Sequence, residues 1–174
     1  MTLASSVSAQ TVAVGPYYAT PSWDQTLACA TLANCPRFVV LANMSSAAVL
    51  DRETGLVWER SPSTELLAWR AGQVRCNEFV TIGNRLGWRL PTLQELASLI
   101  DPSQNSPALP PGHPFLNVQV TDYYFTATAD GRNTDNKYIV SFSGDGDLAN
   151  GQAGNEAEHK FVWCVRGGPG ENPQ

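Results

Sequence analysis

Apolar residues after Thr92 repeat at the spacing of an amphipathic helix. They occupy positions i, i+3, i+4 and i+7, which places them on one face: Leu93, Leu96, Ala97 and Ile100. Thr92 and Glu95 have the spacing of a capping box, in which each side chain accepts the other residue's backbone N–H. Pro91 keeps Leu90 extended. The pattern therefore predicts an extended segment that turns into a short helix ending near Asp101.

Runs of β-branched and aromatic residues predict strands elsewhere in the chain. The runs cover residues 37–41, 123–128, 137–142 and 160–166. Two shorter apolar runs, 48–50 and 56–58, flank a connection that contains Gly55, as in a β-hairpin. Strands and helices mixed in this way predict an α+β domain.

A second helix is predicted to begin at Ser61 and Pro62, because serine is a good N-cap and proline is tolerated in the first turn. One face of this helix holds the residues expected to point inward: Trp69, Gly72, Cys76 and Phe79 or Val80. Cys76 therefore suits a structural role better than a catalytic one. Aromatic residues inside elements normally pack, so four tryptophans are predicted in the core: Trp58, Trp69, Trp88 and Trp163.

Three loops connect the later elements. Residues 101–120 carry five prolines, residues 130–136 are polar, and residues 143–158 are acidic and rich in glycine. A loop as long as 101–120 inside a compact domain is commonly functional.

Composition excludes several classes of protein. The chain has 174 residues and a net charge of -5, and its eleven basic residues are scattered. Binding to nucleic acid or another polyanion requires clustered Lys and Arg, so such a partner is not expected. No apolar run reaches the roughly 18 residues of a membrane span.

The ends of the chain differ in character from its middle. Residues 1–36 are predicted to form a loop-rich N-terminal arm or linker, residues 37–168 the domain, and residues 169–174 a tail. Residues 1–9 have small residues where a secretory signal would be cleaved, but they lack its basic start. They are therefore either a clipped signal remnant or a flexible leader.

The four cysteines are Cys29, Cys35, Cys76 and Cys164. They contain no Cys-x-x-Cys pair and the chain has only two histidines, which argues against a zinc site. Of the three possible pairings we favour Cys29 with Cys35, which closes a short loop, and Cys76 with Cys164, which ties a helix to the last strand. Disulfides would place the protein in an oxidising compartment. The alternative is four buried free thiols in a cytosolic protein.

Five blocks of residues stand in an order that resembles a known family. They are 51–58, Ala68-Trp69 with Cys76-Asn77, 88–92 with Glu95-Leu96, 123–128, and 163–168. Together they resemble the Lcl C-terminal domain family over roughly residues 37–168.

The resemblance implies a C-type-lectin-like fold, in which two helices pack on a twisted, mostly antiparallel sheet. It also implies a bridge from a cysteine in the first helix to the last strand, which supports Cys76 with Cys164. Members are mostly exported bacterial proteins. The family's namesake is a trimer that binds sulfated glycosaminoglycans, but the net charge of -5 argues against carrying that ligand over to this chain.

Candidate ligand-binding residues lie on the predicted loops, where recognition residues of such folds are commonly found. They are Asp122, Tyr123, Asn133, Asp135, Asn136, Asp145, Asp147 and Asn150. The loop from Asp145 to Glu156 bears a weak similarity to a calcium site, but its spacing misses the EF-hand pattern. A tight turn rich in Asp and Gly is favoured there, and no cofactor is expected. Arg89 is expected to pair with Asp101 or Glu95 rather than to bind an anion.

No sequence motif of a catalytic site is present. We therefore expect a non-enzymatic binding or adhesion module, extracellular, at the cell surface or periplasmic, that recognises a glycan or protein ligand. The alternative is a structural subunit of an extracellular homo-oligomeric or filamentous assembly, built through the N-terminal arm.

Overall fold

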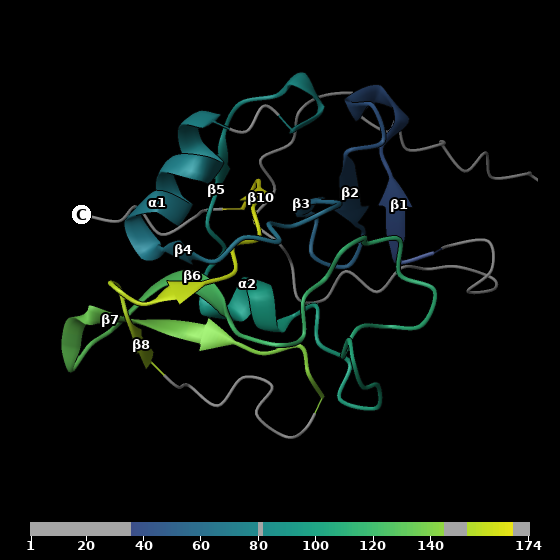
Figure 1. The fold of residues 1–174 in the computed structure, drawn as a ribbon. Helices are drawn as coiled ribbons and strands as arrows, with labels where there is room; N and C mark the ends of the chain where they lie inside the picture. Colours follow the sequence, from purple (N-terminus) through teal and green to yellow (C-terminus); the bar gives the residue numbers. More distant parts are fainter. Residues whose placement is uncertain (1–35, 80–81, 145–152, 169–174) are drawn as a thin grey trace, which may run out of the picture.

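A five-stranded antiparallel sheet, in the order β1-β2-β3-β10-β5, is the largest element of the computed structural model (Figure 1). The structure describes residues 36–79, 82–144 and 153–168. Within these residues two smaller antiparallel sheets, β4-β9 and β6-β7-β8, complete an α+β fold with short helices. The α+β prediction is confirmed. The strands expected in a mostly antiparallel sheet divide among these three antiparallel sheets.

The N-terminal half of the large sheet follows the predicted hairpin. Strand β1 (Phe38–Val40) pairs with β2 (Ala48–Asp51), which pairs with β3 (Val57–Glu59). Gly55 has a φ of +72°, a left-handed conformation that favours glycine, and its N–H donates to the carbonyl of Asp51. The tight connection therefore depends on Gly55.

The helix predicted after Thr92 is α2 (Leu93–Ala97), and its capping box is present. The Thr92 hydroxyl accepts the N–H of Glu95, and the Glu95 carboxylate accepts the N–H of Thr92 at 2.8 Å. Turns continue to Ile100, so the regular helix ends earlier than predicted. Leu99, which the predicted stripe omitted, is fully buried.

The second helix, α1, spans Trp69–Val74 and continues into a π-helical turn, Arg75–Phe79. The prediction that it begins at Ser61 and Pro62 is wrong. The N–H of Ser63 donates to the carbonyl of Val162, and residues 67–68 form strand β4 (Leu67–Ala68), which pairs with β9 (His159–Lys160). Pairing with the C-terminal part of the chain therefore holds this segment extended until Trp69.

The third sheet corrects two of the predicted loops. Strands β6 (Tyr124–Asp130) and β7 (Asn133–Val140) are joined at Gly131 and Arg132, so residues 130–136 are mostly strand. The Asp130 carboxylate accepts the N–H of Arg132, which closes the turn tightly and lets both strands extend. Strand β8 (Ala153–Asn155) lies within the second predicted loop.

The predicted last strand is divided. Its ends are β9 and β10 (Val165–Arg166), which join different sheets, and the residues between them are buried. The other partner of β10, besides β3, is β5 (Trp88–Arg89). Two short 3-10 helices, Ala42–Met44 and Ile82–Asn84, complete the elements described.

The loop at 101–120 contains no helix or strand, as predicted, but it packs into the core. Its backbone donates from Ala108 to the carbonyl of Phe142 and from Leu116 to the carbonyl of Arg60. Leu109 and Phe115 are buried beneath it. Backbone hydrogen bonds and buried side chains therefore fix the loop against the rest of the domain.

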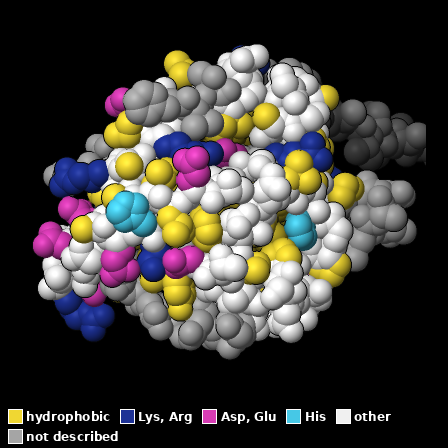
Figure 2. All heavy atoms as spheres, in the orientation of Figure 1, with side chains coloured by type: hydrophobic (Ala, Val, Ile, Leu, Met, Phe, Trp, Pro, Cys, Tyr) yellow, Lys and Arg dark blue, Asp and Glu magenta, His cyan; other side chains and the backbone are white. Residues whose placement is uncertain are grey.

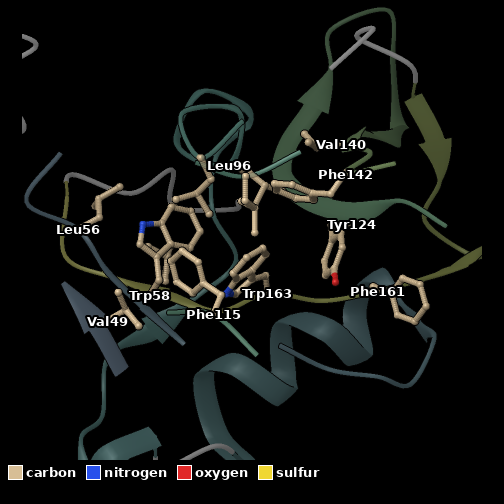
Figure 3. Packing of buried hydrophobic residues seen from close by; sticks show 13 residues of the cluster. Val49, Leu56, Trp58, Leu96, Phe115, Tyr124, Val140, Phe142, Phe161 and Trp163 are labelled. Carbon is tan, nitrogen blue, oxygen red and sulfur yellow. The ribbon is translucent and has the colours of Figure 1, made fainter. Parts of the chain in front are cut away.

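Aromatic residues dominate the larger of two core clusters (Figure 3). Trp163 lies at its centre, with ring contacts to Trp58, Phe115, Tyr124 and Phe142 at centroid distances of 5.0 to 5.9 Å. The second cluster contains Trp69, Trp88 and both described cysteines. All four tryptophans predicted in the core are buried. No helix in the described part of the chain is long and apolar enough to cross a membrane.

Candidate functional site

Cys76 and Cys164 form the predicted disulfide. Their Cα atoms are 5.5 Å apart, and the bond joins the π-helical turn after α1 to the residue preceding β10. Both side chains are buried. The bond crosses 88 residues of sequence and therefore fastens the first helix to the end of the domain. Cys29 and Cys35 lie outside the described residues.

Two predicted ligand-binding residues, Asp122 and Tyr123, come together at Lys160. The Lys160 ammonium lies 3.0 Å from Asp122 Oδ1, 3.5 Å from Glu158 Oε2 and 5.5 Å from the centroid of the Tyr123 ring. Burial opposes the charge of Lys160, but the hydrogen bond and charge of Asp122, with the nearby Glu158, outweigh it and raise the pKa of the amine. Lys160 is therefore a fixed cation between two carboxylates.

Backbone pairing places this group. Lys160 is opposite Leu67 in the β4-β9 pair, and the N–H of the next residue, Phe161, donates to the carbonyl of Tyr123. The segment before β6 is thereby held against β9. Residues 38 positions apart in sequence, Asp122 and Lys160, become neighbours.

The predicted residues Asn133, Asp135 and Asn136 lie on β7 and not on a loop. The side chains of Asn133 and Asp135 are exposed, and Asn136 pairs with Asn155 of β8. The amide oxygen of Asn133 accepts the N–H of Asp135. They form the polar end of the β6-β7 hairpin, separate from the Lys160 group.

The turn between β8 and β9 links the two groups. Glu156 in this turn donates its N–H to the carbonyl of Asp135 and accepts the N–H of Trp69. Its carboxylate lies 3.5 Å from the Lys137 ammonium and 3.6 Å from the Arg70 guanidinium. The Lys137 ammonium also lies 4.5 Å from the centroid of the Trp69 ring, a cation–π contact. The turn is thus anchored both to β7 and to the start of α1.

We define the turn surface as the side chains around the β8-β9 turn: Asp122, Tyr123, Asn133, Asp135, Asn136, Asn155, Glu156, Glu158, His159 and Lys160. Figure 2 shows acidic and basic side chains interspersed at the end of the molecule that carries β7 and β8. The lysines and arginines there are paired with carboxylates: Lys160 with Asp122 and Glu158, Lys137 and Arg70 with Glu156, and Arg132 with Asp130. The surface therefore presents balanced charge and no cationic patch.

The ligand-binding residues predicted from the sequence did not include five members of this surface: Asn155, Glu156, Glu158, His159 and Lys160. His159 and Glu158 are exposed. The signal was the polar run Glu158, His159 and Lys160, which extends from the last residue of the predicted loop to the first residue of the predicted strand. Only the contact with Asp122 identifies it as part of a surface.

The remaining predicted ligand-binding residues, Asp145, Asp147 and Asn150, lie outside the described residues. Glu156, at the end of the proposed calcium loop, is held by Lys137 and Arg70. No group of His, Cys, Asp or Glu that could hold a metal ion occurs among residues 36–79, 82–144 and 153–168. The expectation of a tight turn without a cofactor at this loop stays a prediction.

Arg89 does not face a ligand. Its guanidinium donates to both carboxylate oxygens of Glu95 at 2.8 and 2.7 Å, which confirms the predicted internal pair. The same Glu95 completes the capping box of α2. Arg89 therefore stabilises the start of the helix.

In a comparison with protein families, the family described as Lcl C-terminal domain matches residues 47–166. The match confirms the resemblance seen in the five blocks. A search of the curated proteins found no match, and a search of the solved structures also found none. The C-type-lectin-like assignment therefore stays a prediction.

Proposed function

Because the chain belongs to the Lcl C-terminal domain family, we propose that it is the binding or adhesion module of an exported protein, without enzymatic activity. The disulfide between Cys76 and Cys164 supports export, since such bonds persist in oxidising compartments such as the periplasm and the cell exterior. The ligand is a glycan or a protein. Recognition takes place at the turn surface.

One observation carries this proposal. Asp122 and Tyr123, named from the sequence as ligand-binding residues, are held next to Lys160 and Glu158 at one surface. Tyr123 is held by its backbone hydrogen bond with Phe161, the residue after β9, and binding residues positioned by a rigid scaffold are a common arrangement. A half-buried aromatic ring beside fixed donors and acceptors suits contact with a polar ligand.

The balance of charge limits the class of ligand. Lys160, Lys137 and Arg70 each lie next to a carboxylate, so a sulfated or phosphorylated polymer would meet acidic groups beside every cation. Carboxylates, amides and one tyrosine ring fit an uncharged glycan or a mixed protein surface better. The same pairing leaves no free carboxylate pair among these residues for acid and base catalysis.

The test is binding of the full-length protein to an array of immobilised glycans that includes sulfated and uncharged members. Tyr123→Ala and Asp122→Asn should each reduce binding about tenfold or more, which corresponds to about 1.4 kcal/mol. Glu78→Gln is the matched control, because it removes an exposed carboxylate on the π-helical turn after α1 and should bind like the wild type. Thermal unfolding of each variant checks that the fold is retained.

Two outcomes would count against the proposal. Equal binding by the wild type, Tyr123→Ala and Asp122→Asn would exclude the turn surface as the binding site. Binding of the protein to sulfated glycans only would contradict the expectation, based on the paired charges, that the ligand is an uncharged glycan or a mixed protein surface. Binding to no glycan would leave a protein ligand, which the same two variants test by crosslinking at the surface of the producing cell.

A second function is a structural subunit of an extracellular assembly that forms through the N-terminal arm. The observation that favours it is the outer edge of β1, the strand that follows the arm, which pairs with no further strand among the described residues. This function does not depend on the turn surface.

A further inference from the structure

Strand β1 is the outermost strand of the five-stranded sheet, and among the described residues only β2 pairs with it. An edge strand presents a row of unpaired backbone N–H and C=O groups that can pair with another strand. Proteins commonly protect such edges with charged residues or proline. Phe38, Val39 and Val40 include neither.

The register identifies which backbone groups face outward. Arg52 donates to the carbonyl of Arg37, and Leu41 donates to the carbonyl of Ala48. In an antiparallel pair, hydrogen-bonded residues alternate with residues that point their backbone groups away from the partner. Phe38 and Val40 therefore direct their N–H and C=O groups away from β2, and no backbone hydrogen bond joins them to a described loop.

The side chains of the same residues contribute to the core. Phe38 and Val40 are half-buried and pack against the larger aromatic cluster, and the Phe38 ring lies 5.1 Å from that of Phe115. The edge is thereby held in position and does not need to order before it accepts a strand. A preformed edge loses less conformational entropy on pairing.

The chain itself offers a strand for this edge. Residues 11–14, Thr-Val-Ala-Val, consist mostly of β-branched residues and are bounded by Gly15 and Pro16. Val12 and Val14 would lie on one face of a strand, because side chains alternate. Residues 15–36 join this segment to β1 and could span roughly 70 Å when extended, ample to return to the edge.

We propose that the outer edge of β1 is a docking site for residues 11–14 of this chain, which add a sixth strand to the sheet. The added strand pairs with the outward backbone groups of Phe38 and Val40. The segment comes from the same molecule and closes the edge, because residues 15–36 are long enough to return it there. The proposal is independent of ligand binding at the turn surface.

Amide hydrogen exchange measured by NMR on the full-length protein tests the proposal. The variant Val12→Pro/Ala13→Pro removes two consecutive donors, one of which must face β1 because donors alternate along a strand. The amides of Phe38 and Val40 should exchange about tenfold or more faster in this variant than in the wild type. Asp24→Pro/Gln25→Pro carries two prolines in the same arm outside the segment and should exchange like the wild type.

The exchange rates of the Phe38 and Val40 amides distinguish the possible outcomes. Equal exchange at Phe38 and Val40 in the wild type and in Val12→Pro/Ala13→Pro would overturn the proposal. So would equal acceleration by both pairs of prolines, because the effect would not belong to residues 11–14. Protection that is independent of protein concentration supports docking within one molecule. Protection that increases with concentration would overturn it and indicate docking from a second copy.

Discussion

Arg75 donates to both carboxylate oxygens of Glu59, at 2.9 and 2.6 Å, and its Nη1 also lies 2.9 Å from Cys164 Sγ. Glu59 is buried, and its carboxylate accepts the N–H of Cys164 as well. The indole N–H of Trp163 donates to the carbonyl of Glu59 at 2.8 Å. One ion pair thus connects β3, the turn after α1 and the segment that carries the disulfide.

Arg75→Ala should destabilise the protein by about 3 kcal/mol, because removing one partner of a buried pair leaves an uncompensated charge. Urea unfolding at neutral pH measures the loss. Arg70→Ala is the matched control, since Arg70 is exposed on the same helix and its pair with Glu156 is a surface contact expected to contribute less than about 1 kcal/mol. Losses of equal size in the two variants would contradict the structural role assigned to Arg75.

The disulfide should contribute strongly to stability, because it closes a long segment of chain. Cys76→Ala/Cys164→Ala should lower the free energy of unfolding by about 2–5 kcal/mol. Chemical denaturation of the variant beside the wild type checks this, with mass spectrometry after thiol labelling to confirm that Cys76 and Cys164 are bonded in the wild type. A variant as stable as the wild type would show that packing alone joins α1 to the last strands.

His113 should make stability depend on pH. Its ring stacks on Phe115, and burial lowers the pKa of the imidazole, since the charged form is poorly solvated there. The unfolded state then binds a proton more readily than the folded state. The contribution of neutral His113 to the free energy of unfolding is fully present above the ordinary histidine pKa of about 6.5. It is lost as the pH falls through the lower pKa that His113 has in the folded state.

The free energy of unfolding should therefore decrease as the pH falls from about 7 to 5, and His113→Gln should reduce that decrease. Denaturant unfolding at a series of pH values measures it. His159→Gln removes an exposed ring and serves as the control that keeps the wild-type profile. A steeper decrease in His113→Gln would mean that the buried ring favours its charged form.

Several features could be predicted from the sequence because they depend on residues close together in the chain. The capping box of Thr92 and Glu95 needs only a spacing of three, and the hairpin around Gly55 needs only a turn residue between two apolar runs. Burial of the four tryptophans follows from their size and apolar surface. The pairing of Cys76 with Cys164 was favoured from the sequence and supported by the resemblance.

Other features depend on contacts between distant segments, which only the tertiary structure supplies. Asn133 to Asn136 have the composition of a loop, yet they continue β7 because β6 and β8 pair with that strand. Helix α1 begins at Trp69 because the preceding residues donate to and pair with the C-terminal segment. The meeting of Asp122 and Lys160 requires the β4-β9 pair and the segment before β6 in their final positions. The sequence alone determined the local turns, caps and core residues, because neighbouring residues decide these, whereas tertiary pairing decided the strand boundaries and the composition of the turn surface.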